Sequence, residues 1–242
     1  MTNASIAGAA LGAPAKADPY ANSQSMEFRF RARRFAHVRR LIDTILAERG
    51  RADILDLGGT ETYWRIGADF LRDNRHRLSI TLVNPEPQAV QDGVVFAFHA
   101  ASATDPTLFA GRGFDLVHSN SVIEHLGSWR AMQDFAANAR RLAPRYYIQT
   151  PNFWFPYEPH FRFPGFQYLP AALRARLIMR LSLGFFRRID DRAEADDIIR
   201  HHRLLSTGEM AALFPDGRIF HEKAFGLNKS IIAIRGEAPR AG

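Results

Sequence analysis

The sequence predicts an α/β protein in which helices cover both faces of a mostly parallel, seven-stranded sheet. Seven short apolar runs have the length and composition of strands, and segments with apolar residues at helical spacing lie between several of them. The last two runs are close enough in sequence to pair as an antiparallel hairpin. Strands that alternate with helices build a doubly wound parallel sheet, so we expect that architecture with a C-terminal antiparallel pair.

The first element is a long amphipathic helix over residues 28–49. Its apolar residues recur at helical spacing while arginines occupy the other faces, so it should pack by one stripe. A second helix is predicted over residues 128–142, between the fourth and fifth strands. The expected strands are residues 53–57, 78–83, 94–98, 114–118, 146–149, 218–221 and 230–235.

A long stretch, residues 150–215, separates the fifth strand from the C-terminal hairpin. It opens with aromatic residues and prolines and continues into helix-like segments, which is too long for a plain loop. We expect a helical insertion that forms a lid or substrate-binding region. Within it, residues 171–188 hold five arginines among bulky apolar residues. That composition fits either the outer face of a lid helix or peripheral contact with an anionic membrane surface.

Composition limits the class of protein. With 242 residues, 46% of them hydrophobic, the chain can bury one sizeable core. We expect a disordered tail at residues 1–25, a single domain over residues 26–242 and no membrane-spanning helix. The absence of cysteine excludes disulfides and thiolate metal sites and fits a cytoplasmic protein. A net charge of +7 favours polyanionic partners without choosing among them.

The segment 54–60 carries the main motif. It is an apolar strand that ends at Asp56 and Leu57 and runs into Gly58 and Gly59. In an open parallel sheet the ligand lies beyond the carboxyl ends of the strands, where glycine lets the backbone approach closely. The motif therefore predicts a nucleoside cofactor at this turn, although a strand followed by two glycines can also be a simple tight turn.

Downstream partners make the motif more specific. The fourth strand leads into Ile123-Glu-His-Leu126, and Gln149-Thr-Pro-Asn152 follows the fifth. Together these segments resemble the Rossmann-like class I S-adenosylmethionine-dependent methyltransferases, in particular the methyltransferase type 11 or ubiquinone O-methyltransferase-like group. The resemblance covers roughly residues 53–152. It implies a bacterial-type enzyme that uses S-adenosylmethionine as its cofactor.

The resemblance also implies cofactor contacts, position by position. Asp56, Gly58 and Gly59 are expected to line the methionine and ribose parts of the cofactor, and Asn84 and Glu86 to bind the ribose hydroxyls. Ser102 and Asp105 are expected near the adenine, and Ser119 near the methionine end. Thr60 and Thr62 replace two glycines of the family pattern, which argues against a dinucleotide site. Asn84 replaces the usual acidic residue. Asp105 has the alternative role of a helix N-cap.

Transfer of a methyl group to a hydroxyl requires removal of its proton, so histidines and carboxylates near the strand ends are candidates. His125 follows the fourth strand, and Glu158 and His160 follow the fifth. We expect these three residues to be catalytic, as general base or substrate clamp. His125 has the alternative role of a structural histidine that bonds to the backbone.

Some members of the family hold magnesium through a Glu-x-x-Glu-His run. Here Ser121 takes the place of the first glutamate, which removes a charge and an oxygen ligand. We therefore expect no bound metal, although Glu124, His125, Glu158 and His160 could still gather an ion.

The acceptor is left open by the sequence. We expect O-methylation of a small-molecule, saccharide or lipid-linked acceptor, with peripheral contact to the inner membrane face through residues 171–188. One alternative is an RNA methyltransferase that uses the basic helix 28–40 as a phosphate track. Another is a non-catalytic module that keeps the fold, suggested by Thr60, Thr62 and Asn84. The oligomeric state is not indicated.

Overall fold

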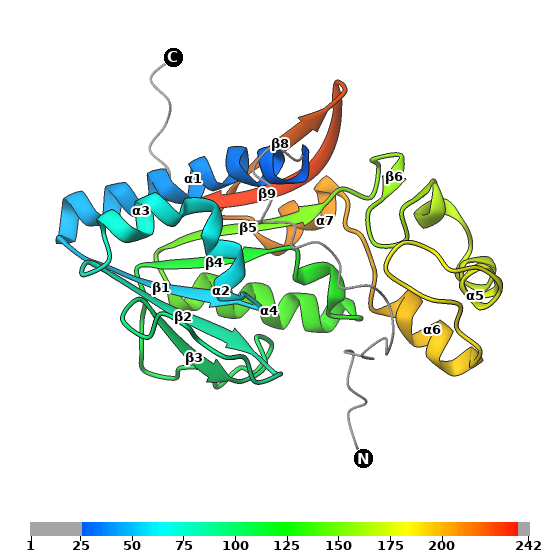
Figure 1. Cartoon of the computed structure of the whole chain (residues 1–242), viewed down its shortest axis with the longest axis horizontal. Helices are drawn as coiled ribbons and strands as arrows, with labels where there is room; N and C mark the ends of the chain where they lie inside the picture. Colours follow the sequence, from blue (N-terminus) through cyan, green and yellow to red (C-terminus); the bar gives the residue numbers. More distant parts are fainter. Residues whose placement is uncertain (1–25, 237–242) are drawn as a thin grey trace.

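A computed structural model describes residues 26–236, so the tail expected at residues 1–25 lies outside the described part. Its centre is a seven-stranded sheet with the order β3-β2-β1-β4-β5-β9-β8 (Figure 1). The strands are β1 (Ala52–Leu57), β2 (Leu78–Asn84), β3 (Phe96–Ala100), β4 (Leu116–Asn120), β5 (Arg145–Pro151), β8 (Arg218–Ala224) and β9 (Leu227–Arg235).

The strand directions confirm the predicted architecture. Strands β1 to β5 are parallel to one another, whereas β9 is antiparallel to both β5 and β8. The chain first builds the sheet outward through β2 and β3 and then returns to add β4 on the other side of β1. The order of strands therefore reverses between β1 and β4, where open α/β sheets place their ligands.

Alternating side chains of the strands supply two hydrophobic cores. On one face, Ile54 and Leu116 pack with helix α1 (Met26–Arg49) and with the short helices α2 (Glu61–Trp64), η1 (Arg65–Gly67) and α3 (Ala68–Asp73). On the other face, Leu55 and Val117 pack with α4 (Trp129–Leu142) and α7 (Thr207–Leu213). Figure 1 shows α1 and α3 on one side of the sheet and α4 on the other. The predicted helices over residues 28–49 and 128–142 are thereby confirmed.

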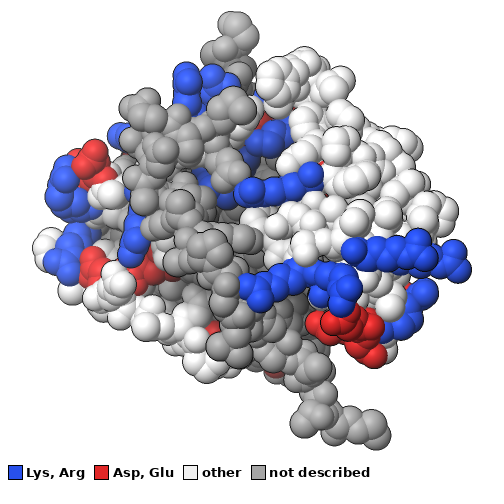
Figure 2. Space-filling view, turned by 45° about the vertical axis from the view of Figure 1, so that its right-hand side comes forward, with Lys and Arg blue, Asp and Glu red and all other residues white. Residues whose placement is uncertain are grey.

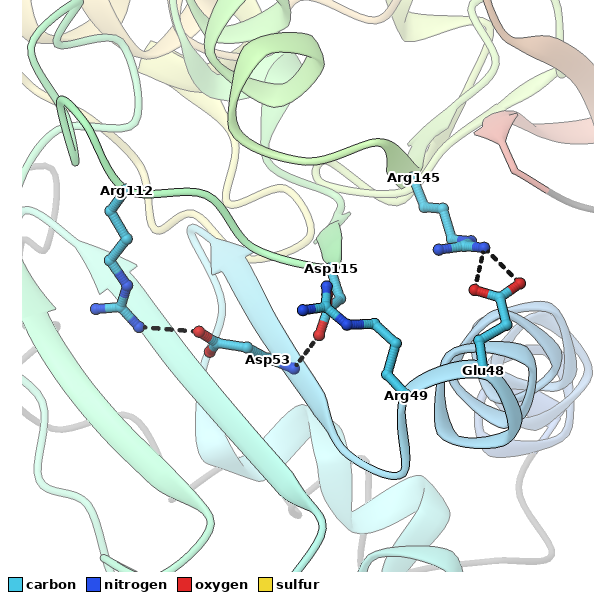
Figure 3. A network of polar contacts seen from close by, with 6 residues as sticks. All are labelled: Glu48, Arg49, Asp53, Arg112, Asp115 and Arg145. Carbon is cyan, nitrogen blue, oxygen red and sulfur yellow. Dashed lines mark hydrogen bonds and ion pairs between the residues drawn. The ribbon is translucent and has the colours of Figure 1, made fainter.

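The amino-terminal edge of the sheet is held by a polar network (Figure 3). Asp115 is buried; one of its oxygens pairs with Arg49 at the end of α1, and the other accepts a hydrogen bond from the Asp53 amide at 2.8 Å. Beside them, Arg145 at the start of β5 forms two hydrogen bonds with Glu48, at 2.7 and 2.8 Å. The network fixes α1 against three strands at the edge opposite the predicted site.

The insertion between β5 and β8 begins with residues 153–204, which we call the lid. It holds the small hairpin of β6 (Tyr157–Glu158) and β7 (Phe163–Pro164), the turn η3 (Phe166–Tyr168), and helices α5 (Ala171–Arg180) and α6 (Arg192–Arg200). The expected helical insertion is therefore present. A third hydrophobic cluster lies within it, made of Phe161, Phe166, Ala175, Ile178, Ala195 and Ile199.

The arginine-rich segment 171–188 is helical only as far as Arg180. Ala175 and Ile178 of α5 are buried in the lid, and Leu173 is exposed. Figure 2 brings the lid side of the molecule forward and shows Lys and Arg side chains at several separate places among uncharged ones. Over residues 26–236, no helix combines the length and apolar character needed to cross a membrane.

Candidate active site

The turn after β1 lies where the strand order reverses. Gly58 has a φ of +74°, which favours glycine, and a side chain there would overlap the methyl groups of Val122 in the loop after β4. A side chain at Gly59 would overlap the carboxylate of Asp56. Both glycines are therefore required by close packing at this edge of the sheet, whatever ligand it binds.

The Asp56 carboxylate has an internal role that the sequence did not indicate. It is fully buried, accepts a hydrogen bond from Trp64 Nε1 at 2.8 Å and lies 2.7 Å from His118 Nδ1. His118 in turn stacks on Tyr147, with ring centroids 5.6 Å apart. Both oxygens of the Asp56 carboxylate therefore have partners inside the protein, and its contact with a cofactor stays a prediction.

The other expected cofactor residues lie along the carboxyl edge but mostly bond locally. Ser119 is buried and donates to the Leu57 carbonyl at 2.8 Å. Asn84 Oδ1 accepts from the Glu86 amide at 3.3 Å, with Glu86 exposed. Ser102 is exposed at the end of β3. Each keeps the position that the sequence predicts, and their contacts to a cofactor stay a prediction.

Asp105 has the capping role that was its alternative, although it caps a turn and not a helix. Its Oδ1 accepts hydrogen bonds from the Thr107 amide at 2.8 Å and from the Thr107 hydroxyl at 2.7 Å. These bonds lower the pKa of Asp105 below its usual value.

One polar group at this edge has no partner among the described residues. The Oδ1 atom of Asn120, at the carboxyl end of β4, is buried without a hydrogen bond. The next residue, Ser121, has a φ of +56°, in the left-handed region that is costly for residues other than glycine. Sequence reasoning missed Asn120, whose only signal was its position after a predicted strand.

A cluster of histidines and carboxylates lies beyond β4 and β5. Glu124 and His125 belong to the turn η2 (Ile123–His125), which follows β4, while Glu158 and His160 come from the lid hairpin. The rings of His125 and His160 are 4.8 Å apart between centroids. The structure therefore brings together all three residues predicted to be catalytic.

His202 completes the cluster and was missed by sequence reasoning. It follows α6, and its ring centroid lies 4.7 Å from that of His125 and 5.0 Å from that of His160. The His201-His202 pair in the sequence was the only available signal. Its neighbours in space come from the folding of the lid and not from the sequence order.

Hydrogen bonds fix the tautomers of the three rings. His125 Nδ1 donates to the His201 carbonyl at 3.1 Å, and His202 Nδ1 donates to the Ile198 carbonyl at 2.7 Å. His160 Nδ1 bonds to the Glu158 carboxylate at 2.7 Å. Since carbonyl and carboxylate oxygens only accept, each neutral ring carries its proton on Nδ1 and leaves Nε2 as a lone-pair donor.

Burial sets the charges of the cluster. It lowers the pKa of His125 to about 4 and that of His202 to about 3. Burial also opposes charge on His160, but the hydrogen bond and negative charge of Glu158 outweigh it and raise the pKa of His160. Burial raises the pKa of Glu124 to about 7, against the charge of His160. Two neutral imidazoles thus surround the one that takes a proton most readily.

Part of the cluster has the spacing of a metal site. One ligand atom each from Glu124, His125 and His160 lies within 4.8 Å of the others. Glu158, which the sequence placed in the same group, supports His160 from behind and accepts from the Phe161 amide at 2.6 Å. The arrangement can therefore act as a proton acceptor or hold a cation.

One member of the cluster borders a cavity of about 700 Å³ between the lid and the start of α7. His202 lines it together with Phe153 and Trp154 from the start of the lid and Arg174 from α5. This volume is in the range of pockets that take a small molecule. None of the residues predicted to contact the cofactor is among the residues that line this cavity, so the cavity and the cluster form a candidate site for the acceptor.

Comparison with known proteins finds distant structural likenesses. No family model matches the chain, and no curated protein matches it. An O-methyltransferase family protein from Burkholderia thailandensis is 17% identical with a TM-score of 0.48, over 79% of this chain and 52% of that one, so the chain spans about half its length.

Two further solved structures are similar. The 1,6-didemethyltoxoflavin-N1-methyltransferase of Burkholderia thailandensis, with bound S-adenosylhomocysteine, is 18% identical with a TM-score of 0.45, over 94% of each chain. A structure described as a Zn-dependent alcohol dehydrogenase from Rhodobacter sphaeroides is 15% identical with a TM-score of 0.45, over 79% of this chain and 86% of that one. Likenesses at this level carry no argument about the activity of this chain.

Proposed function

We propose that the protein is an S-adenosylmethionine-dependent methyltransferase that methylates an oxygen atom of a small molecule. The observation that supports this proposal is the histidine cluster: two of its members follow β4, Glu124 bonds to Thr150 of β5, and His202 lines a cavity. In an open α/β sheet ligands bind beyond the carboxyl ends of the strands, and methylation of a hydroxyl can use a nearby proton acceptor.

The residues at the reversal fit a nucleoside cofactor that carries a positive charge. Asn120 offers a buried, unpartnered acceptor oxygen, which suits the ammonium group of a methionine moiety. The backbone of Gly58 and Gly59 would line the same moiety, and Asn84 and Ser102 would lie toward the ribose and adenine. When bound, S-adenosylmethionine supplies an activated methyl group on its sulfonium.

The cluster is the part of the chain that would manage the proton of the acceptor. As the oxygen gains its methyl group, the O–H bond breaks and the proton passes to this basic region. His160 is positioned by Glu158, and His202 connects the cluster to the cavity. Phe153 and Trp154 at the cavity wall suit an acceptor with an apolar or ring-shaped part.

Binding of the cofactor tests the proposal. We expect S-adenosylmethionine to bind the full chain in isothermal titration calorimetry and Asn120→Ala to weaken it by about 10-fold, the loss of one hydrogen bond to a charged group. Asn74→Ala, at a residue whose side chain bonds to Phe70 and Arg77 away from this edge, is the control. Absence of binding by the unaltered chain would remove the proposal.

The acceptor class is tested separately. Tritium transfer from methyl-labelled S-adenosylmethionine to a panel of phenols, saccharides and polyprenyl-linked saccharides should give a labelled ether with at least one of them. Glu158→Gln should reduce that transfer by about 100-fold, the typical contribution of an acid–base group. Label on nitrogen or carbon only would show that oxygen is not the acceptor atom.

A further inference from the structure

We propose that Glu124, His125 and His160 bind a divalent transition-metal ion of the zinc type. Two of these ligands follow β4 and the third comes from the lid, so the site would join the lid to the sheet domain. The inference starts from the three ligand atoms that lie within 4.8 Å of one another.

The spacing is somewhat wider than one ion requires. Zinc lies about 2.0–2.2 Å from nitrogen and carboxylate oxygen, so two ligand atoms on a tetrahedral ion are about 3.4 Å apart. The three ligand atoms here lie within 4.8 Å of one another, so rotation of the side chains would bring them closer by up to about 1.4 Å when the ion binds.

Each ligand is already oriented by a second residue. His125 Nδ1 donates to the His201 carbonyl, and His160 Nδ1 bonds to the Glu158 carboxylate, which leaves Nε2 of both rings for the ion. Glu124 Oε2 accepts from the Thr150 hydroxyl at 2.9 Å. Histidines and carboxylates that ligate metals are held in this way by carbonyls, carboxylates and hydroxyls behind them.

A buried atom without a partner points to the same ligand. Glu124 is fully buried, and its Oε1 makes no hydrogen bond among the described residues. The two histidine rings each have their Nδ1 atom bonded elsewhere, so their Nε2 atoms are available beside this oxygen. A cation would satisfy all of them at once, whereas a buried carboxylate oxygen left unpaired costs free energy.

The types of ligand atom determine which class of ion the site prefers. Two imidazole nitrogens and one carboxylate suit Zn²⁺, Fe²⁺, Mn²⁺ or Ni²⁺, whereas Mg²⁺ prefers oxygen ligands and retains water. Three protein ligands leave a position open, as in catalytic metal sites. His202 lies beside His125 and lines the cavity, so the proposed metal site is next to a residue that borders the space proposed for the acceptor.

A role for the ion in methyl transfer rests on the proposed function, whereas its binding does not. At the open position a bound ion would lower the pKa of an acceptor hydroxyl. Because His125 and His160 would then be ligands of the ion, the hydroxyl proton would pass to water in the cavity and not to the histidine cluster, while the oxygen takes the methyl group. Metal binding is therefore measured without S-adenosylmethionine and without an acceptor.

The test uses the untagged full chain, stripped with a chelator and titrated with ZnCl₂ by calorimetry, with MgCl₂ in parallel. We expect one Zn²⁺ per chain and much weaker binding of Mg²⁺. Glu124→Gln and His160→Ala should each weaken zinc binding by more than 10-fold, and Glu158→Gln by about 10-fold, as expected for a second residue that orients a ligand. His76→Ala is the matched control, because His76 is exposed and is not one of the proposed ligands. This variant should bind zinc as tightly as the unaltered chain does.

Circular dichroism shows whether each variant is folded. If His160→Ala does not fold, Glu158→Gln still tests whether His160 is a ligand, because Glu158 orients the His160 ring. Absorption of bound Co²⁺ gives a second signal, which should be lost in Glu124→Gln. The inference is overturned if zinc does not bind at one per chain, if all variants bind it equally, or if Mg²⁺ binds more tightly. Zinc binding without S-adenosylmethionine binding would uphold the metal site and defeat the proposed function.

Discussion

Gly59 lies against the Asp56 carboxylate, which is held in turn by Trp64 and His118. A methyl group at this glycine would have to displace a buried carboxylate from two partners. At Gly93, by contrast, a methyl group would meet no atom within 4 Å. Comparing alanine substitutions at the two glycines therefore separates the free-energy cost of steric overlap from the general effect of replacing a glycine.

We expect Gly59→Ala to lower the free energy of unfolding by about 2 kcal/mol, in the usual range for an overpacked site. Gly93→Ala should change it by less than about 1 kcal/mol, because open space accepts the methyl group. Urea denaturation followed by circular dichroism measures both. Equal stability of the two variants would mean that the contact at Asp56 is not as tight as described.

The hydrogen-bond partners of some single residues could not be predicted from the sequence. Alternation along a strand predicts which residues are buried, but it does not predict the side-chain orientation of Asp56 and Ser119 at the strand ends. Both side chains form hydrogen bonds inside the protein. His125, Glu158 and His160 could be selected by residue type and position. His202 could not, because its place beside them depends on how the lid folds.

At the scale of elements, the C-terminal strand β9 is tied to the region around α4 by Asp216. The Asp216 carboxylate accepts from Tyr146 at 2.8 Å and pairs with Arg235 at 2.5 Å and Arg140 at 3.0 Å. Partial burial would raise the pKa of Asp216, but these three partners outweigh it and lower the pKa. The ionised form is therefore favoured in the folded state.

A lowered pKa makes this contribution depend on pH. It is fully present above the ordinary aspartate pKa of 3.8 and is lost as the pH falls through the lower value of the folded state. We expect Asp216→Asn to lower the free energy of unfolding by about 1 kcal/mol at pH 7, since a third of the side chain is exposed and the ion pairs are partly screened.

Urea denaturation at pH 7, 5 and 3 gives the required comparison. The difference between the unaltered chain and Asp216→Asn should persist at pH 5 and shrink at pH 3. Asp69→Asn is the control, because Asp69 pairs with Arg72 while 85% of its side chain is exposed. A difference that grows toward pH 3 would contradict the assigned direction of the pKa shift.

The elements themselves were largely predictable. Every expected strand exists, and most bounds differ by one to three residues, because apolar runs and strand length carry the signal. The short helices between residues 61 and 73 were not predicted: α2 has four residues and α3 has six, too few for a periodic pattern. The hairpin of β6 and β7, with two residues in each strand, was missed for the same reason.

At the scale of the whole molecule, the chain has two cores on the sheet and a separate one in the lid. Phe166 is fully buried in the lid core, where it stacks on Phe161 with ring centroids 4.2 Å apart. A domain with separate cores can open in parts, since each cooperative unit has its own stability. The lid is therefore the part of the chain expected to open first.

We expect Phe166→Ala to abolish the slow amide hydrogen exchange of residues 157–200 while leaving that of β1, β4 and β5 unchanged. Removal of a buried phenylalanine costs about 3–5 kcal/mol, and that cost falls on the unit that contains it. Leu173→Ala, at a half-exposed position of α5, is the control and should leave exchange in both parts unaltered. Faster exchange throughout the sheet would show that the lid and sheet unfold together.

The same experiment connects the lid to the proposed metal site. Glu124 and His125 belong to the sheet domain and His160 to the lid, so an ion bound by all three resists opening of the lid. At a free zinc concentration 100-fold above its dissociation constant, binding stabilises the closed form by about 2.7 kcal/mol. Zinc should therefore slow exchange in residues 157–200 of the unaltered chain by up to about 100-fold and leave the Glu124→Gln variant unchanged. If zinc binds but exchange in the lid is unaffected, His160 is not one of its ligands.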